Sequence, residues 1–259
     1  MTKVYAMTPA VSRVREGAYG EAILPENAQP GPVYVYDAAV RAWHWVTALC
    51  IFVLAVTGYF IGSPPPSIDG EAYQHFMFGY IRMTHFIAGQ ILGVMFIVRL
   101  YRVLVGGPHA RQIFTLPFWD LGWWKEIFYE IQWYLFLKPR AKDYVGHNPL
   151  AHIAMFFVFL LPLVVLLLTG FALYAEDSGI QSSWYKVFGW VFLVLGDSMT
   201  VHTVHHIGMW VIVLFSMIHM YLAVREDFTR RQTTVSAMVS GCRPTHRSGS
   251  SSGAGRNSW

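Results

Sequence analysis

The sequence predicts an all-α integral membrane protein, a bundle of four transmembrane helices with further helices at the membrane surface. Three observations lead to this prediction. The composition is 54% hydrophobic and only 13% charged, whereas soluble domains are nearer one quarter charged. Four apolar segments have roughly the 20 residues that a bilayer core requires. Finally, lysine and arginine are concentrated in alternate connections between these segments, as in multi-pass proteins.

The four predicted spans define the domain organisation. They cover about residues 43–62, 83–105, 150–174 and 201–225. Within the third span, Pro162 is expected to cause a kink. The spans form a predicted membrane domain at 41–226, between a polar tail at 1–40 and a second tail at 227–259. The Ser/Gly-rich end of the second tail is predicted to be disordered, and no internal repeat is apparent.

Two shorter hydrophobic segments are predicted not to cross the membrane. Phe118 to Leu137 is rich in Trp and Tyr but carries several charges, which favours a helix lying among the lipid headgroups. Trp184 to Leu195 is too short to cross about 30 Å of hydrocarbon. We therefore expect this second segment to be interfacial or re-entrant.

The basic residues predict an orientation. All but two of the 19 Lys and Arg residues lie before the first span, in or beside the connection between the second and third, or after the fourth. The exceptions are Arg82 and Lys186. Because basic residues mark cytoplasmic loops, both termini and the middle connection are predicted to be cytoplasmic.

The last span carries four histidines, which are costly in hydrocarbon unless each has a partner. His205 and His219 are fourteen residues apart. At about 100° and 1.5 Å per residue, they share one helix face and lie about 21 Å apart along the axis. His202 and His206 miss the azimuth of His219 by about 100° and 140°. Two imidazoles at two depths indicate two stacked metal cofactors, and haem is the first candidate because imidazole ligates its iron.

Histidines on two other spans match these depths. In the predicted orientation, His85 lies near the outer face, as His205 does, and His44 lies near the inner face, as His219 does. A bis-histidine haem takes its ligands from facing helices, so the predicted pairs are His85–His205 and His44–His219. His75 is a weaker candidate because it precedes the second span. Without a C-x-x-C-H motif, both haems would be held non-covalently, as in b-type cytochromes.

A small residue lies one helical turn after each predicted ligand. These residues are Ala48, Gly89, Gly208 and Ala223. Because residues at i+3 and i+4 share a helix face, small ones could leave room for a flat porphyrin. Close packing of membrane helices is the alternative explanation, although it accounts less well for the coincidence with four histidines.

Several motifs together resemble the cytochrome b subunit of membrane-bound nickel-iron hydrogenases. They are RAWHWV, GYIRMTHFIAG, YVGHNPLAH, VHTVHHIGMW and HMYLAVRED, and the similarity extends from about Val33 to Cys242. That family is related to the cytochrome subunits of formate dehydrogenases, which share the plan of four helices and two haems. The resemblance implies the same ligand pairs, with the outer haem between the second and fourth spans and the inner haem between the first and fourth.

The resemblance also implies a function, partners and a location. The chain would anchor an uptake hydrogenase to the bacterial cytoplasmic (inner) membrane. It would pass electrons from the iron-sulfur small subunit, through two haem b groups, to quinone. The small subunit and the large nickel-iron subunit would lie at the outer face, and the hydrogen-activating site would lie outside this chain. Nucleic acid is not an expected partner.

A quinone site is predicted at the cytoplasmic entrance of the third span. Its candidates are His147, Asn148 and His152, because histidine relays protons near neutral pH and an asparagine amide hydrogen-bonds to a carbonyl. An equally good interpretation is a helix start, with Asn148 as the N-cap before a proline in the first turn.

Other functions stay open at this point. The same module could serve a formate dehydrogenase or a thiosulfate reductase, or it could be a stand-alone b561-like cytochrome. A proton-coupled transporter with an intramembrane histidine relay belongs to a different class. That class predicts acidic residues within the spans, and the sequence has none there.

Overall fold

The computed structural model describes residues 15–16, 22–23, 32–34, 36–66, 75–105, 114, 116–138, 149–230 and 234–244. The chain divides into two compact units. The bundle unit comprises Ala42–Leu116 and His152–Met220. The terminal unit comprises Met1–Arg41, Pro117–Ala151 and Tyr221–Trp259.

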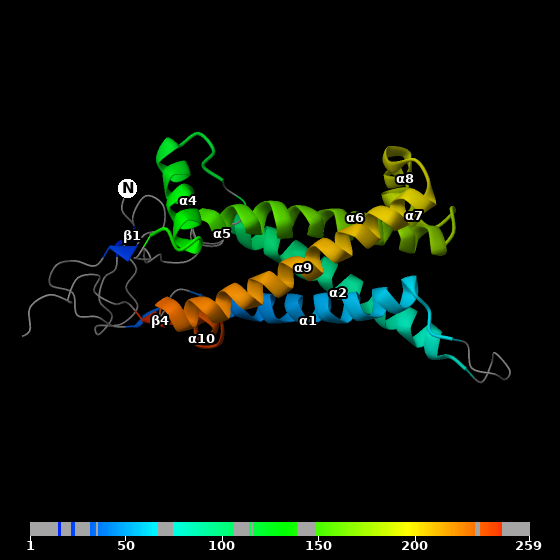
Figure 1. Cartoon of the computed structure of the whole chain (residues 1–259). Helices are drawn as coiled ribbons and strands as arrows, with labels where there is room; N and C mark the ends of the chain where they lie inside the picture. The colour runs from blue at the N-terminus through cyan, green and yellow to red at the C-terminus, as the bar shows by residue number, and fades with distance from the viewer. Residues whose placement is uncertain are drawn as a thin grey trace, which may run out of the picture. The chain divides into compact units, whose positions relative to one another are not determined.

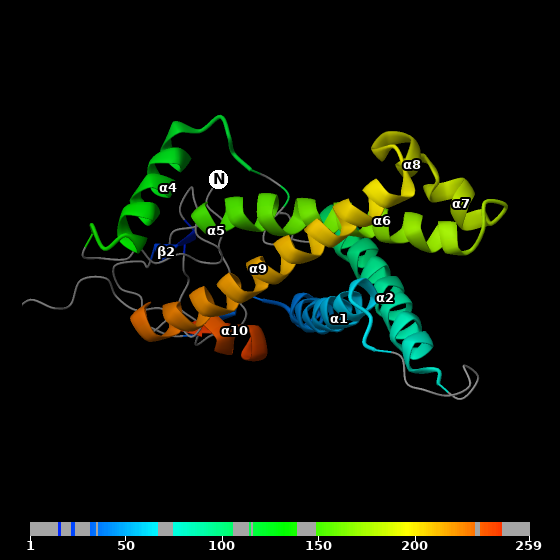
Figure 2. The ribbon, with the colours of Figure 1, turned by 45° about the vertical axis from the view of Figure 1, so that its right-hand side comes forward.

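Four helices are long and apolar enough to cross a membrane, which confirms the predicted number of spans. They are α1 (Ala38–Gly62), α2 (Met77–Val105), the continuous run of α5 (Pro149–Ala154), η3 (Met155–Leu160) and α6 (Leu161–Asp177), and α9 (Ser198–Arg230) (Figures 1 and 2). Each helix extends beyond its predicted span at one end or both, because the apolar stretch marks only the part expected inside hydrocarbon. Leu49, Phe52, Ile97 and Leu214 are all more than half exposed, so the bundle has the apolar exterior that lipid contact requires.

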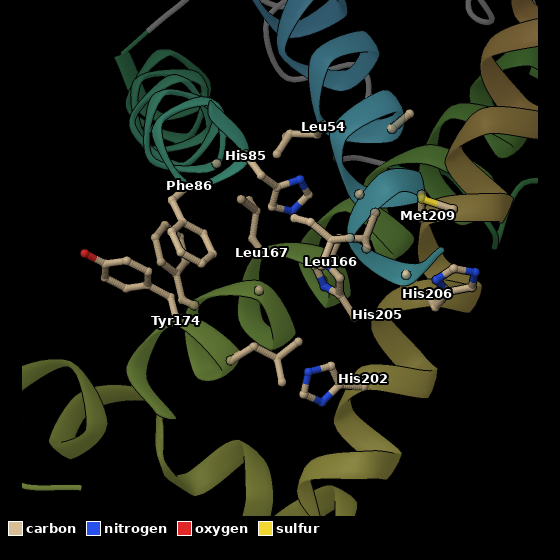
Figure 3. Close-up of a pocket in the computed structure, with 18 of the residues that line it drawn as sticks. Leu54, His85, Phe86, Leu166, Leu167, Tyr174, His202, His205, His206 and Met209 are labelled. Carbon is tan, nitrogen blue, oxygen red and sulfur yellow. The ribbon is translucent and has the colours of Figure 1, made fainter. Parts of the chain in front are cut away.

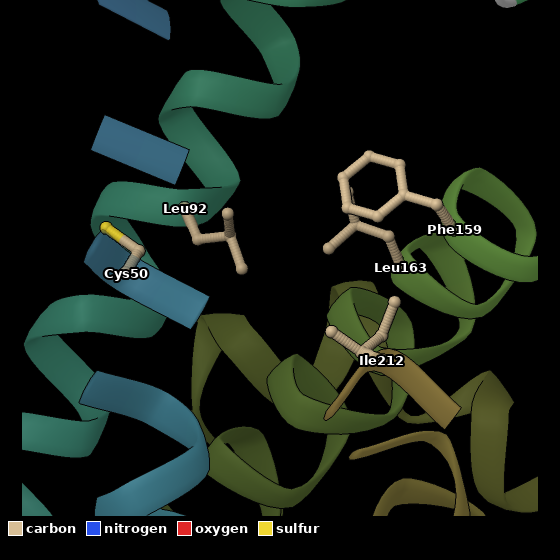
Figure 4. Close-up of a cluster of buried hydrophobic side chains, with 5 residues drawn as sticks. All are labelled: Cys50, Leu92, Phe159, Leu163 and Ile212. Carbon is tan, nitrogen blue, oxygen red and sulfur yellow. The ribbon is translucent and has the colours of Figure 1, made fainter. Parts of the chain in front are cut away.

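The centre of the bundle unit is an apolar cluster to which every long helix contributes. Its buried members are Cys50, Leu92, Phe159, Leu163 and Ile212 (Figure 4). On α9, Ile212 is seven residues from both His205 and His219, which is about 10 Å along the axis in each direction. The hydrophobic core therefore lies between the levels of the two predicted cofactors.

The third span contains a π-helical segment at the place where a kink was expected. In η3, the Leu161 N–H donates to the carbonyl of Phe156, five residues back. Pro162 follows directly, and its ring would clash with the carbonyl of residue 158 in a regular α-helix while offering it no N–H. The wider turn accommodates the proline, and the extra residue shifts the helix face on which Thr169 lies.

Two short helices join α6 to α9. They are α7 (Ser183–Phe188) and α8 (Trp190–Leu195), which agrees with the prediction that this segment does not span the membrane. Trp184 stacks on Phe171 of α6, with ring centroids 5.8 Å apart. Gly196 then turns the chain with a φ of 105°, a value that glycine adopts without strain.

Asp197 provides the N-cap of α9. Its Oδ1 accepts a hydrogen bond from the Thr200 backbone N–H at 2.6 Å. The Thr200 backbone N–H, and then the Thr200 hydroxyl, hold the pKa of the Asp197 carboxyl below its ordinary value. A charged cap also interacts favourably with the positive end of the helix dipole, so the start of the histidine-bearing helix is well defined.

The terminal unit holds the remaining elements. They are α4 (Leu121–Tyr134), α10 (Thr234–Ser240), and two antiparallel strand pairs: β1 (Arg15–Glu16) with β2 (Ala22–Ile23), and β3 (Pro32–Tyr34) with β4 (Cys242–Pro244). The strands, and α10, lie in segments that the sequence predicted only as polar tails. The β3–β4 pairing joins those two tails, a long-range contact that composition does not reveal.

The helix α4 agrees with the prediction of a non-spanning amphipathic segment. Its 14 residues extend only about 21 Å. Trp123 and Ile127 are buried, whereas Leu121 and Phe128 are more than half exposed. The Arg225 guanidinium lies 4.9 Å from the centre of the Trp133 ring, a cation–π contact between α4 and the end of α9. Placement of α4 among lipid headgroups stays a prediction.

Candidate functional site

The bundle unit brings the four predicted histidines together as two pairs. The ring centroids of His85 and His205 are 6.4 Å apart, and those of His44 and His219 are also 6.4 Å apart. A metal–imidazole bond is about 2.0 Å long, and the ring nitrogen lies about 1.2 Å from the centroid. Two imidazoles on opposite sides of one metal ion therefore have centroids about 6.4 Å apart.

A cavity of about 930 Å³ surrounds the His85–His205 pair. Figure 3 shows the two rings extending from α2 and α9 toward the same space, beside Leu54, Leu166 and Leu167. The volume is at the upper end of the range for ligand pockets, and a mostly apolar lining with a few polar groups is typical of cofactor sites.

A threonine on a neighbouring helix contacts each imidazole of this pair. The Nδ1 atom of His85 lies 2.9 Å from Thr57 Oγ1 on α1. The Nδ1 atom of His205 lies 2.9 Å from Thr169 Oγ1 on α6. Both threonine hydroxyls also donate to a carbonyl of their own helix: Thr57 to Val53 at 2.6 Å, and Thr169 to Val165 at 2.7 Å.

The glycine after each threonine makes room for the same ring. A Cβ atom on Gly58 would lie 3.1 Å from His85 Cε1, and a Cβ atom on Gly170 would lie 3.0 Å from His205 Cε1. Both separations are shorter than an ordinary van der Waals contact. Each imidazole is thus seated against a Thr-Gly pair of the adjacent helix.

The His44–His219 pair has different surroundings. Phe215 stacks on His219, with centroids 5.5 Å apart and the rings within 14° of parallel. Trp45 meets His44 edge-on. The Nδ1 atom of His44 is buried, and no described residue forms a hydrogen bond with it.

Two other histidines of α9 lie beside the cavity but outside the pairs. His202 and His206 are exposed, and Figure 3 shows them apart from the paired rings. His202 Nδ1 donates to the Ser198 carbonyl at 2.9 Å. At the same cavity, Arg82 of α2 and Asp177 of α6 form an ion pair of 2.8 Å.

The predicted quinone residues are only partly described. His152 is buried in α5, whereas His147 and Asn148 lie outside the described residues. The helix begins at Pro149, which agrees with the proline-initiated helix start considered as the alternative. A role in quinone binding stays a prediction for all three residues.

The expected small residues are not the ones in closest contact with the rings. Gly89 lines the cavity, but a Cβ atom on Gly208 would meet Leu166 instead of a histidine. The glycines that face His85 and His205 come from the neighbouring helices. The contact of Gly208 with Leu166 fits the alternative explanation, close packing of membrane helices, and room for a porphyrin beside these small residues stays a prediction.

Imidazoles in pairs suit an iron whose remaining ligands come from a porphyrin. Among the described residues, no group of three or more His, Cys, Asp or Glu side chains could hold a metal ion. The comparison with known proteins decides which kind of cofactor protein this is. A family model described as prokaryotic cytochrome b561 matches residues 35–241. The chain belongs to the prokaryotic cytochrome b561 family.

Individual relatives of this cytochrome confirm the resemblance drawn from its motifs. A protein from Rhizobium leguminosarum bv. viciae is 53% identical over 224 residues, 86% of this chain and 92% of the relative. One from Azotobacter vinelandii is 53% identical over 211 residues, 82% of this chain and 88% of the relative. Both are named "Probable Ni/Fe-hydrogenase B-type cytochrome subunit". An Escherichia coli K12 relative, named as the corresponding subunit of Ni/Fe-hydrogenase 1, is 46% identical over 218 residues, 83% of this chain and 92% of the relative.

A cytochrome b of this family is a multi-pass membrane protein that holds haem b. Three observations show that the residues of this chain fit a haem. They are the 6.4 Å separation of the paired imidazoles, the cavity around one pair, and the glycines that leave space for the rings. The assignment of individual histidines to iron stays a prediction.

The threonines of this cytochrome were missed by the sequence interpretation, although the sequence holds a signal for them. The motif V-L-x-x-T-G occurs twice, at residues 53–58 and 165–170. This short internal repeat was not recognised from the sequence. The repeat is six residues long and lies in apolar segments where Val and Leu are common, so it is easily overlooked without the structure.

Replacing Gly170 with valine is expected to displace the His205 ring and to reduce the haem content. Overpacking of a tight contact costs about 1–3 kcal/mol, and valine adds two branches at a position where a Cβ alone would be 3.0 Å from the ring. Haem per protein is measured by the pyridine haemochromogen method. Gly79→Val is the matched control, because a Cβ atom there meets nothing within 4 Å. Equal haem contents in the two variants would contradict the packing argument.

Proposed function

We propose that this chain is the di-haem b-type cytochrome subunit of a nickel-iron uptake hydrogenase. It anchors the enzyme to the membrane and passes electrons from the iron-sulfur small subunit to quinone. One observation carries the proposal: the same ligand geometry occurs twice, with 6.4 Å between centroids in each pair. Because α9 supplies one histidine to each pair, two haems on one shared helix account for the arrangement.

Haem supplies reversible one-electron chemistry at its iron. The residues of this chain position it and tune its potential through axial ligation, hydrogen bonding and burial. In the proposed orientation, His85 and His205 lie on the outer side and His44 and His219 on the inner side. The two histidine levels are about 21 Å apart along α9, and two porphyrins held there would fill much of that interval, which would bring their edges close enough for electron transfer.

The proposed quinone site adjoins the inner haem. Its candidates are His147, Asn148 and His152, at the start of the helix that begins at Pro149. A histidine there supplies protons near neutral pH, and an asparagine amide donates to a quinone carbonyl. The burial of His152 supports a sheltered site more than a solvated helix end.

The names of the relatives support hydrogenase as the partner over formate dehydrogenase or thiosulfate reductase. We place the iron-sulfur small subunit and the nickel-iron large subunit at the outer face. The location is the bacterial inner membrane, with both termini in the cytoplasm as the basic residues indicate.

Purification from membranes with a tag on this chain tests the proposal. We expect the large nickel-containing subunit to co-purify, two haem b per chain, and a redox titration with two midpoint potentials. Addition of hydrogen should reduce both haems, and a quinone analogue should reoxidise them. A single haem per chain, or a preparation that lacks nickel, would refute the di-haem or the hydrogenase part, respectively.

A further inference from the structure

The two Thr-Gly pairs form one structural unit that occurs twice around the cavity. Within V-L-x-x-T-G, the Thr57 hydroxyl lies 2.6 Å from the Val53 carbonyl and 3.4 Å from that of Leu54. The corresponding distances from Thr169 are 2.7 Å to Val165 and 3.3 Å to Leu166. In both units the threonine oxygen is 2.9 Å from an imidazole Nδ1 atom. The unit on α1 contacts His85 of α2, and the unit on α6 contacts His205 of α9.

The hydrogen bonds determine where the imidazole proton lies. A threonine hydroxyl has one hydrogen, and at 2.6 Å and 2.7 Å that hydrogen is donated to the carbonyl of Val53 or Val165. The threonine oxygen is then an acceptor toward the imidazole. Nδ1 of His85 and Nδ1 of His205 must therefore carry hydrogen, which leaves Nε2 of each ring with a free lone pair for a metal.

We propose that Thr57 and Thr169 are positioning residues that fix this tautomer and hold down the reduction potential of the haem between His85 and His205. This inference rests on the proposed function. A hydrogen bond from Nδ1–H to an acceptor raises the basicity of the ligating nitrogen. A more basic ligand stabilises ferric iron more than ferrous iron, so the potential falls. The chain of bonds from carbonyl to hydroxyl to imidazole strengthens the effect, because each bond polarises the next.

The other pair provides an internal contrast. No described residue forms a hydrogen bond with His44 Nδ1, whereas Thr57 and Thr169 lie 2.9 Å from the Nδ1 atoms of His85 and His205. Changes at Thr57 and Thr169 should therefore affect one haem and leave the potential of the other unchanged.

The test is a redox titration of the purified complex carrying Thr57→Val, Thr169→Val or both. Valine keeps the shape of threonine and removes the acceptor. Loss of such a partner changes metal–ligand equilibria by about tenfold, which corresponds to about 59 mV for a one-electron couple. We expect one midpoint potential to rise in each single variant, to rise further in the double variant, and to be the potential that is missing in His205→Ala. The electron paramagnetic resonance signal of that ferric haem should shift as well.

Two controls separate a tuning role from a structural one. Thr57→Ser and Thr169→Ser keep the hydroxyl, so both the potential and the resonance signal should match those of the wild-type protein. Ser178→Ala removes an exposed hydroxyl at the end of α6 that donates to the Tyr174 carbonyl at 2.8 Å and does not line the cavity, and it should shift nothing. Two unshifted potentials in the Thr→Val variants would overturn this inference while leaving the di-haem proposal intact. Absence of haem from the wild-type protein would overturn the proposed function itself.

Discussion

Replacing His205 with alanine is expected to leave one haem per chain of the two proposed for the wild-type protein. His205 lies against Thr169 and Gly170, and its ring centroid is 6.4 Å from that of His85. Alanine removes one axial ligand and leaves a void beside the other. A b-type haem has no covalent bond to the protein, so the site should lose its cofactor. Haem per protein should fall by about half by pyridine haemochromogen assay, and one of the two midpoint potentials should disappear.

His85→Ala should abolish the same potential as His205→Ala, because both residues belong to one pair. His202→Ala is the matched control on the same helix, since His202 is exposed and bonds to the Ser198 carbonyl. It should keep both haems. If His85→Ala and His205→Ala abolished different potentials, the pairing would be wrong. Circular dichroism and gel filtration establish that each variant is folded.

The histidine pairs could be predicted from the sequence because two strong regularities coincide in α9. Helical geometry fixes the relative azimuth and depth of His205 and His219. The distribution of basic residues fixes which ends of the helices lie at one level. Together these reduce the possible partners to His85 and His44, and the structure brings those residues into contact distance.

The surroundings of each pair could not be predicted in the same way. Which side chain accepts from an imidazole depends on how neighbouring helices are rotated, and a long apolar helix gives little indication of its rotation. The π-helical segment before Pro162 illustrates the difficulty. One additional residue in a turn rotates the following residues, including Thr169, by about 100°, so the contact to His205 follows only once that turn is known.

Composition does not reveal short strand pairs. The tails were predicted from their polar, Pro- and Gly-rich sequences, yet β3 pairs with β4 across more than two hundred residues of chain. Strands of three residues have almost no periodicity to detect, and their pairing depends on tertiary contacts. Short pairings of this kind are accessible only from coordinates.

Replacing His44 with alanine is expected to interrupt electron transfer after the first haem. The imidazole of His44 is paired with that of His219 at a centroid separation of 6.4 Å, and alanine would remove one proposed axial ligand. The haem proposed between His85 and His205 should keep its ligands, its cavity and both threonine contacts. In the purified complex with the hydrogenase, hydrogen should still reduce this remaining haem, whereas quinone reduction should fall to the level of a complex that lacks the cytochrome subunit.

The reciprocal variant makes the order of the two haems testable. In His205→Ala, hydrogen should no longer reduce the remaining haem at a rate that supports turnover, but a quinol should reduce it from the opposite side. His75→Ala provides the control, because His75 is exposed and lies outside both pairs. Stopped-flow spectra with hydrogen and with quinol distinguish the cases. If hydrogen failed to reduce the haem that remains in His44→Ala, and reduced the one that remains in His205→Ala, the pair His44–His219 would be the one nearer the hydrogenase. The orientation derived from the basic residues would then have to be reversed.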